Sequence, residues 1–347
     1  MENEVMSKSN GYTVGSLFAG IGGICQGFKD AYFNVLWANE FDTYAGITYR
    51  ENFKHSLNSS DIHNLNPSDF KKVDVITAGF PCQAFSIAGY RQGFNDNRGN
   101  LFFEAMRFIN TIKPKAFILE NVRNLISHDN GRTFQIIKDT ILDSGYSFIP
   151  RVMNSMEYGN VPQTRERIYV VGFRGEAGFE SLEKKSCSEN FRWPEKVSLT
   201  KSIKDILEKG KVDEKYYYKK TCHFYDLLKK GMRSRDTVYQ WRRIYLRENK
   251  SQVCPTLTAN MGMGGHNVPL VADDYGIRKL TPRECARLQG FKENYRLPKI
   301  ADSHLYKQFG NSVSVSVIQH IAKSIQNALD YKYSDKTALD LKELVHI

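Results

Sequence analysis

One of the six cysteines in this 347-residue sequence stands where a nucleophile could be presented. Cys82 follows Pro81, shortly after the apolar run Val73–Ala78, which predicts a buried strand. Open α/β folds bind ligands at the edge where their strands end, so the thiol is expected at that edge. A thiolate there would suit covalent catalysis. The alternative interpretation is a small buried side chain, the more common role of a lone cysteine.

An acid and two arginines occur at the ends of later apolar runs. Glu120 ends the run Ala116–Glu120, which predicts another strand and brings a carboxyl group to the same edge of the sheet. Arg165 and Arg167 lie at the start of the last such run, which ends at Phe173, and the two-residue period of a strand places them on one face. Paired guanidiniums can hold a carboxylate or an anionic backbone, although basic residues entering a strand are commonly just surface.

A glycine-rich turn, Leu17–Gly23, connects a predicted strand to a predicted helix. Its glycines let the backbone approach a ligand closely, and a helix N-terminus favours an anionic group. Glu40 follows the second apolar run, Phe33–Ala38, where an acid can bind a ribose diol in this architecture. The glycine spacing departs from GxGxxG and so argues against a nicotinamide dinucleotide. A tight strand-to-helix turn is the simpler alternative.

The elements that position these residues follow from the alternation of short apolar runs with amphipathic stretches. Leu101–Ile112 and Thr133–Leu142 have helical spacing, and the runs between them predict strands. Such alternation is typical of an α/β fold with a parallel sheet covered by helices. A helical pattern returns after residue 305. We expect a catalytic domain formed by residues 11–185 plus 305–331, a second, loop-rich domain at 186–304, and a peripheral tail at 332–347.

Positive charge is concentrated in the expected second domain. Residues 196–253 hold 16 basic and 7 acidic side chains, which accounts for most of the net charge of +11. The segment also contains aromatic residues, namely Tyr216, Tyr217, Tyr218, Tyr239, Trp241 and Tyr245. Basic residues with interleaved aromatics favour a polyanion such as nucleic acid, and a solubilising surface is the alternative.

Composition excludes several other classes of protein. No apolar run approaches the roughly 18 residues that a membrane-spanning helix needs, and the polar opening lacks the plan of a secretory signal. The cysteines form no CxxC pair and no cluster with histidine, so neither disulfides nor a metal site is indicated. We therefore expect a soluble cytoplasmic protein.

Six motifs, taken in order, resemble those of the bacterial DNA (cytosine-5)-methyltransferase family of restriction-modification systems. They are Phe18–Gly23, Pro81–Gln83, Glu120–Val122, Gln163–Arg167, Arg278–Phe291 and Gly310–Val313. The resemblance runs from about Thr13 to Leu329 and implies a Rossmann-like domain that uses S-adenosyl-L-methionine. It also implies a smaller target-recognition domain, in the stretch that contains the basic segment.

The resemblance assigns roles to the residues found above. Cys82 would be the nucleophile that adds to the base, Glu120 the acid at the ring nitrogen, and Arg165 with Arg167 the holders of base and carboxylate. The cofactor would contact Phe18, Ala19, Gly20, Gly22, Gly23, Glu40, Phe41, Asp61, Ile62, Pro81, Leu101, Asn311 and Val313. The sequence departs from many members at Ser16, where Asp is common, and at Phe41, where Trp is common.

The same resemblance implies methylation of carbon 5 of cytosine within a short sequence of double-stranded DNA, on a base swung out of the helix. DNA contacts are expected from Gln83, Ser86, Arg98, Arg242, Arg243 and Thr256, where the arginines could read bases or contact phosphates alone. The segment 83–100 contains Gly89, Gly93 and Gly99 as candidate hinges, which suits a lid over the DNA, and an ordinary mobile loop is the alternative. We expect a monomer, associated with the bacterial nucleoid through DNA, whose site is shared with a cognate restriction endonuclease. The alternatives are an RNA cytosine-5 methyltransferase, which would read single strands or shape, and a non-catalytic DNA-binding regulator that kept the fold.

Overall fold

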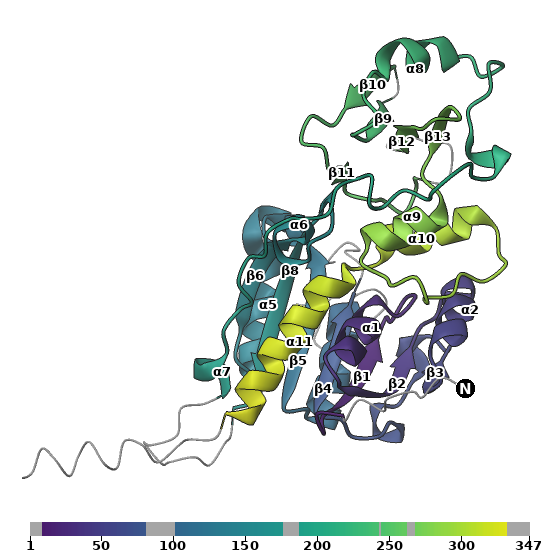
Figure 1. Ribbon diagram of the computed structural model, residues 1–347. Helices are drawn as coiled ribbons and strands as arrows, with labels where there is room; N and C mark the ends of the chain where they lie inside the picture. Colours follow the sequence, from purple (N-terminus) through teal and green to yellow (C-terminus); the bar gives the residue numbers. More distant parts are fainter. Residues whose placement is uncertain (1–8, 81–100, 176–186, 243, 262–267, 332–347) are drawn as a thin grey trace, which may run out of the picture.

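A seven-stranded sheet forms the centre of the larger of two lobes (Figure 1). The structure, a computed structural model, describes residues 9–80, 101–175, 187–242, 244–261 and 268–331. In spatial order the strands are β3 (Ser56–Asn58), β2 (Asn34–Asn39), β1 (Thr13–Leu17), β4 (Val75–Gly79), β5 (Ala116–Val122), β8 (Glu166–Phe173) and β6 (Ile149–Asn154). The strands from β3 to β5 are parallel, so their carboxyl ends meet at one edge.

The expectation of a parallel sheet holds from β3 to β5 and is wrong at β8, which runs antiparallel to both of its neighbours, β5 and β6. β6 and β8 are close in sequence, and antiparallel neighbours need only a short connection, whereas a parallel pair needs a long crossover. The direction of β8 has a consequence for the site. Because Arg167 pairs with Val122, the start of β8 lies at the edge where β5 ends.

Helices cover both faces of this sheet. On one face α1 (Gly23–Asp30) packs against α11 (Val315–Asp330), and on the other lie α4 (Leu101–Ile112) and α5 (Arg132–Asp143). Alternate residues of β4 and β5 enter two separate apolar cores, as the two-residue period of a strand requires. The helices predicted from periodicity are therefore confirmed. Among the described helices, none is long and apolar enough to cross a membrane.

Further helices surround this core. They are α2 (Thr43–Asn52), α6 (Ser155–Tyr158), α7 (Cys187–Asn190), α9 (Pro282–Leu288) and α10 (Asp302–Asn311). α9 contributes Cys285, Ala286 and Leu288 to the same apolar core as α1 and α11. The chain after β13 therefore packs against the large lobe before α11 crosses the sheet.

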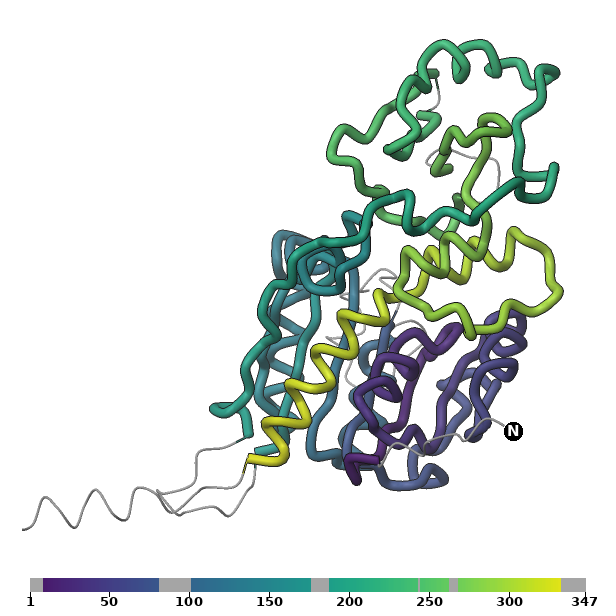
Figure 2. The backbone as a smooth tube through the Cα atoms, viewed as in Figure 1, coloured from purple at the N-terminus to yellow at the C-terminus, as the bar shows by residue number. Residues whose placement is uncertain are grey.

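The smaller lobe contains a four-stranded antiparallel sheet (upper part of Figures 1 and 2). Its strands, in spatial order, are β10 (Tyr245–Glu248), β9 (Tyr239–Arg242), β12 (Pro269–Ala272) and β13 (Ile277–Lys279), and α8 (Tyr225–Gly231) lies beside them. A separate apolar core is formed by Leu228, Met232, Tyr239, Val268, Leu270 and Ile277. The sequence predicts a loop-like region here and misses the sheet, because strands of three or four residues show little periodicity.

Two short strands connect the lobes. β7 (Gln163–Thr164) pairs in parallel with β11 (Cys254–Pro255), between the two larger sheets in Figure 1. The buried side chain of Gln163 accepts a hydrogen bond from the Leu257 N–H at 3.0 Å and donates to the Leu288 carbonyl at 2.8 Å. One amide therefore joins the segment after β11 to the end of α9.

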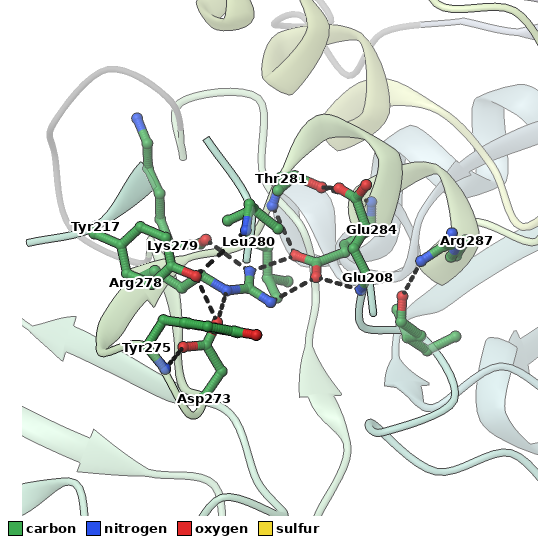
Figure 3. A network of polar contacts seen from close by, with 12 residues as sticks. Glu208, Tyr217, Asp273, Tyr275, Arg278, Lys279, Leu280, Thr281, Glu284 and Arg287 are labelled. Carbon is green, nitrogen blue, oxygen red and sulfur yellow. Dashed lines mark hydrogen bonds and ion pairs between the residues drawn. The ribbon is translucent and has the colours of Figure 1, made fainter. Parts of the chain in front are cut away.

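A buried ion-pair network ties the smaller sheet to α9 (Figure 3). Arg278, on β13, is fully buried and donates from both terminal nitrogens to Glu284 at 2.8 Å and from Nε to Asp273 at 2.6 Å. The Glu284 carboxylate also accepts from the backbone N–H groups of Thr281 and Glu208, each at 2.8 Å. Thr281 and Glu284 form the capping box that begins α9. The carboxylate is thus fully hydrogen-bonded, as a buried charge must be.

We predict that Glu284→Gln lowers the free energy of unfolding by about 3–5 kcal/mol, since it removes one partner of a buried pair and leaves the Arg278 charge undercompensated. Urea unfolding followed by circular dichroism measures this. Asp274→Asn is the matched control, because Asp274 pairs with Arg235 in the same lobe but both side chains are exposed. The control should change stability by no more than about 1 kcal/mol. Equal effects of the two variants would contradict the prediction.

Candidate active site

A cavity of about 760 Å³ opens at the edge where β1, β2, β4 and β5 end. Its size suits a small-molecule ligand. The residues predicted to bind the cofactor that line it are Phe18, Ala19, Gly20, Gly23, Glu40, Phe41, Asp61, Ile62, Leu101, Asn311 and Val313. Gly22 is not among the lining residues, and Pro81 lies outside the described residues. Positions from five separate parts of the sequence thus meet around one space.

The glycine-rich turn is held in a backbone conformation that few residues adopt. Phe18, Gly20 and Gly22 have φ of 52°, 57° and 83°, and a non-glycine residue such as Phe18 in this region carries strain of about 1–3 kcal/mol. A Cβ at Gly20 would meet nothing within 4 Å, whereas one at Gly22 would lie 2.2 Å from the Phe53 ring. Gly22 therefore serves packing, while Gly20 leaves room in the cavity.

Glu40 supports this turn directly. One carboxylate oxygen accepts from the Gly20 N–H and the other from the Asp42 N–H, both at 2.7 Å. Burial raises the pKa of Glu40 more than these hydrogen bonds lower it. Each carboxylate oxygen has a second lone pair, so the side chain can still accept from a hydroxyl in the cavity.

The turn around Asp61 forms the neighbouring wall. Asp61 accepts from the N–H of His63 at 3.0 Å and lies 2.6 Å from its Nδ1, and these interactions lower the pKa of Asp61. Arg107, on α4, donates to the carbonyls of Ile62 and Leu65, each at 2.8 Å. Arg107 is not predictable from the sequence, because its partners are backbone atoms that leave no signal there.

Further polar residues of the cavity were also missed. Asp42 and Lys307 line it and form an ion pair at 2.8 Å. Asp42 also caps α2 by accepting from the Ala45 N–H at 2.9 Å, so an acid in front of a helix that the sequence analysis did not predict was the available signal. Asn121 donates to the Phe80 carbonyl at 2.9 Å and so ties the end of β4 to β5.

A buried acid and an arginine form the far wall of the cavity. The Glu120 side chain is buried, and its Oε1 lies 3.1 Å from Nε of Arg167. Arg167 and Arg165 lower the pKa of Glu120, but burial outweighs them and raises it. A carboxyl group with a raised pKa can remain protonated and donate a hydrogen bond to a ligand. Both Glu120 and Arg167 line the cavity.

Arg165 does not line the cavity, although the sequence predicts it beside Arg167 on one strand face. The chain is not a regular strand at this point, because the Arg165 N–H donates to the Gln163 carbonyl and β8 begins only at Glu166. Arg165 is 1% exposed and is not among the residues that line the cavity. Burial, with Arg167 nearby, lowers the pKa of Arg165 to about 9, so the side chain is still charged at neutral pH.

A second cavity, of about 540 Å³, adjoins the first and shares Val122 and Arg167 with it. Thr256, one of the predicted DNA contacts, lines this cavity and donates from its hydroxyl to the Thr164 carbonyl at 2.6 Å. Arg242 lies at the end of β9 in the smaller lobe. Other predicted residues lie outside the described part of the chain, namely Cys82, Gln83, Ser86, Arg98 and Arg243, together with the expected lid.

Comparisons with known proteins show which family the chain resembles. A model of the C-5 cytosine-specific DNA methylase family matches residues 12–327. The Type II methyltransferase M.Bsp6I of Bacillus sp. strain RFL6 is 51% identical over 320 residues, which cover 91% of this chain and 99% of that protein. The Type II methyltransferase M.HhaI of Haemophilus parahaemolyticus is 36% identical over 329 residues, which cover 91% of this chain and 94% of that protein.

Solved structures show the same fold at low sequence identity. The S. pombe Dnmt2 methyltransferase is 19% identical and has a TM-score of 0.66, covering 92% of this chain and all of its own. These matches confirm the resemblance inferred from the six motifs and the Rossmann-like α/β fold that it implied. The chain therefore belongs to the C-5 cytosine-specific DNA methylase family, and it transfers a methyl group from S-adenosyl-L-methionine to carbon 5 of cytosine in DNA.

Proposed function

We propose that the 760 Å³ cavity holds S-adenosyl-L-methionine against the glycine-rich turn and the target cytosine against Glu120 and Arg167. The proposal rests on one observation. Glu120, a buried acid of raised pKa, and the open face of Gly20 line the same cavity. Glu40 would take the ribose hydroxyls, and Asp61 with Ile62 would hold the adenine. When bound, the cofactor supplies an electrophilic methyl group.

In this proposal Cys82 adds to the base as a thiolate. A bond forms between its sulfur and carbon 6, and the displaced π electrons make carbon 5 nucleophilic. Glu120 donates its proton or a hydrogen bond to ring nitrogen 3, which offsets the charge that the addition develops on the ring. Carbon 5 would then take the methyl group, with a neutral thioether as the leaving group. Loss of the carbon-5 proton to a base re-forms the double bond and expels the thiolate, and ring nitrogen 3 returns its proton to Glu120.

Arg167 would orient the Glu120 carboxyl group that supplies the proton. Its Nε holds Glu120, while one terminal nitrogen donates to the Glu166 carbonyl at 2.8 Å, so the guanidinium is fixed from two sides. A fixed acid loses less entropy when it meets the base. The base itself must leave the duplex, at a cost of a few kcal/mol, before it can reach this depth.

We further propose that residues 186–304 recognise a short specific sequence of double-stranded DNA. The smaller lobe has its own apolar core and carries most of the surplus positive charge, both of which suit a separate DNA-binding unit. Gln83, Ser86, Arg98, Arg242, Arg243 and Thr256 would contact the DNA. The second cavity, beside Arg167, lies where the strand that carries the displaced base would run.

The relatives named as Type II methyltransferases suggest a biological setting. We propose that the protein acts as a monomer in the bacterial cytoplasm, on nucleoid DNA, and protects a sequence that a cognate restriction endonuclease would cut. No contact between the two enzymes is required for this, since each reads the same DNA. Co-purification is therefore not expected, and the endonuclease is to be sought by its cleavage of unmethylated DNA.

We predict that Cys82→Ser abolishes methyl transfer while DNA binding survives, because the serine hydroxyl is a far weaker nucleophile than a thiolate. Purified protein is incubated with S-adenosyl-L-methionine and unmethylated plasmid, and 5-methylcytosine is mapped by bisulfite sequencing. Wild-type protein should methylate one short motif. Cys187→Ser, on α7 outside the described site, is the matched control and should retain activity. Methylation by Cys82→Ser at the wild-type rate would remove the covalent step.

Glu120→Gln should lower turnover by about 100- to 10,000-fold with little change in DNA affinity, because an amide cannot supply the proton. The pH profile gives a second test. Burial raises the pKa of Glu120, so the protonated form persists to higher pH and the rate should fall as pH rises through that raised pKa. The residual rate of the variant should lack this fall. The half-buried acid Glu157, which pairs with Lys196 outside the cavity, provides the control variant Glu157→Gln, which should keep the wild-type profile.

Glu40→Gln should weaken the binding of S-adenosylhomocysteine by roughly 10- to 100-fold, the effect of losing a charge-assisted hydrogen bond worth about 1.5–3 kcal/mol. One of the two N–H groups that Glu40 accepts from, Gly20 or Asp42, would then face an amide NH₂ instead of an oxygen. Isothermal titration calorimetry without DNA measures the affinity. Unchanged affinity in a folded variant would place the cofactor elsewhere.

A further inference from the structure

Three backbone carbonyls from two distant segments converge on the buried guanidinium of Arg165. One terminal nitrogen donates to the Leu257 carbonyl at 2.9 Å, and the other donates to the carbonyls of Gly310 and Ser312 at 3.0 and 2.5 Å. Leu257 belongs to the segment that follows β11, whereas Gly310 and Ser312 lie at the end of α10. A single side chain thus joins parts of the chain that are more than fifty residues apart.

The two segments lead to different ligands. The segment after β11 includes Thr256, which lines the second cavity beside the proposed DNA path. The turn after α10 includes Asn311 and Val313, which line the proposed cofactor cavity. Arg165 itself lines neither cavity, so its guanidinium lies behind both walls.

The two segments are also in direct contact. A Cβ added at Gly310 would lie 2.3 Å from the Thr258 carbonyl carbon and 2.4 Å from the Ala259 nitrogen, so the backbones touch at a point where only glycine fits. Gln163 holds the same segment from the other side by accepting from the Leu257 N–H at 3.0 Å. A displacement of the segment after β11 must therefore move Arg165, the Gly310 backbone, or both.

An arginine is the side chain suited to this position. Its planar fork presents donors in fixed directions, which lets one group satisfy several carbonyls at once, whereas an ammonium group is a compact point charge. Arg165 also has a buried Nε for which the described residues provide no hydrogen-bond acceptor. The side chain thus gives up one hydrogen bond while its terminal nitrogens serve the two segments.

We propose that Arg165 is a positioning residue that couples DNA binding to cofactor binding, through the Leu257 carbonyl on one side and the Gly310 and Ser312 carbonyls on the other. DNA that restrains the segment after β11 fixes Arg165, and Arg165 fixes the wall formed by Asn311 and Val313. By linkage the cofactor must tighten DNA binding by the same factor. The proposal rests on the proposed assignment of the larger cavity to the cofactor.

The test measures the dissociation constant of S-adenosylhomocysteine twice by calorimetry, for the free protein and for the protein saturated with a short duplex that carries the mapped methylation motif. The coupling factor is the dissociation constant of the free protein divided by that of the DNA-bound protein. In the wild-type protein the coupling factor should be at least about 5, within the usual range for allosteric coupling. In Arg165→Met it should fall to about 1, since no donors remain to join the two segments.

Two further variants make the result specific. Arg165→Lys keeps a cation without the fork and should give a coupling factor between those of wild type and Arg165→Met. Arg174→Met is the matched control, because Arg174 also donates to a backbone carbonyl, that of Lys113 at 2.7 Å, but at an exposed position just after β8. Its coupling factor should equal that of wild type. Thermal denaturation establishes that each variant is folded.

Several outcomes would overturn the proposal. A coupling factor of 1 in the wild-type protein would do so, as would a wild-type factor in folded Arg165→Met or, if that variant does not fold, in Arg165→Lys. Lower turnover with both dissociation constants unchanged would make Arg165 a direct contact of the base instead. An unchanged affinity in Glu40→Gln would reject the cofactor assignment, and it is measured without reference to Arg165.

Discussion

The direction of β8 determines where Arg167 lies, and Arg167 in turn determines the environment of the Glu120 carboxyl group. Because β8 runs antiparallel to β5, its first residues pair with the last residues of β5, and Arg167 comes to the edge where the other strands end. A parallel β8 would have placed the same arginine at the opposite edge of the sheet. The acid would then be buried without its cation, in a wall that also has to accept a polar base.

Buried charges and apolar contacts together hold the two lobes in a defined relation. Arg278 with Glu284 fixes β13 on α9, and Arg165 fixes the segment after β11 on the turn after α10. Hydrogen bonds of this kind are directional, so they define one arrangement where apolar surfaces would tolerate several. The smaller lobe has its own apolar core, and Val238 and Val271 of this lobe also pack into the core shared with α1 and α11.

The parts of the structure that were predictable from sequence are those with local signals. The apolar runs predicted strands that end near Glu120 and Glu40, and helical spacing predicted α4 and α5. The antiparallel direction of β8 was not predictable, because periodicity contains no information on direction. Arg107 and Arg165 act on backbone carbonyls of remote segments, and such partners are invisible in a single sequence. The sheet of the smaller lobe was not predictable for a related reason. β9 pairs with β12, which is remote in the sequence, and a single sequence does not show such pairing.

The contact between α1 and α11 has a consequence for how the protein is made. α1 lies near the beginning of the chain and α11 near its end, yet the two pack together on one face of the sheet. About 280 residues separate them, and at roughly 5–20 residues per second their synthesis takes on the order of 15–60 s. Throughout that time the apolar side of α1 lacks its partner. The ribosome must therefore synthesise the chain through α11 before the nascent protein can close this core, and a product of translation interrupted before α11 would expose the surface to chaperones and proteases.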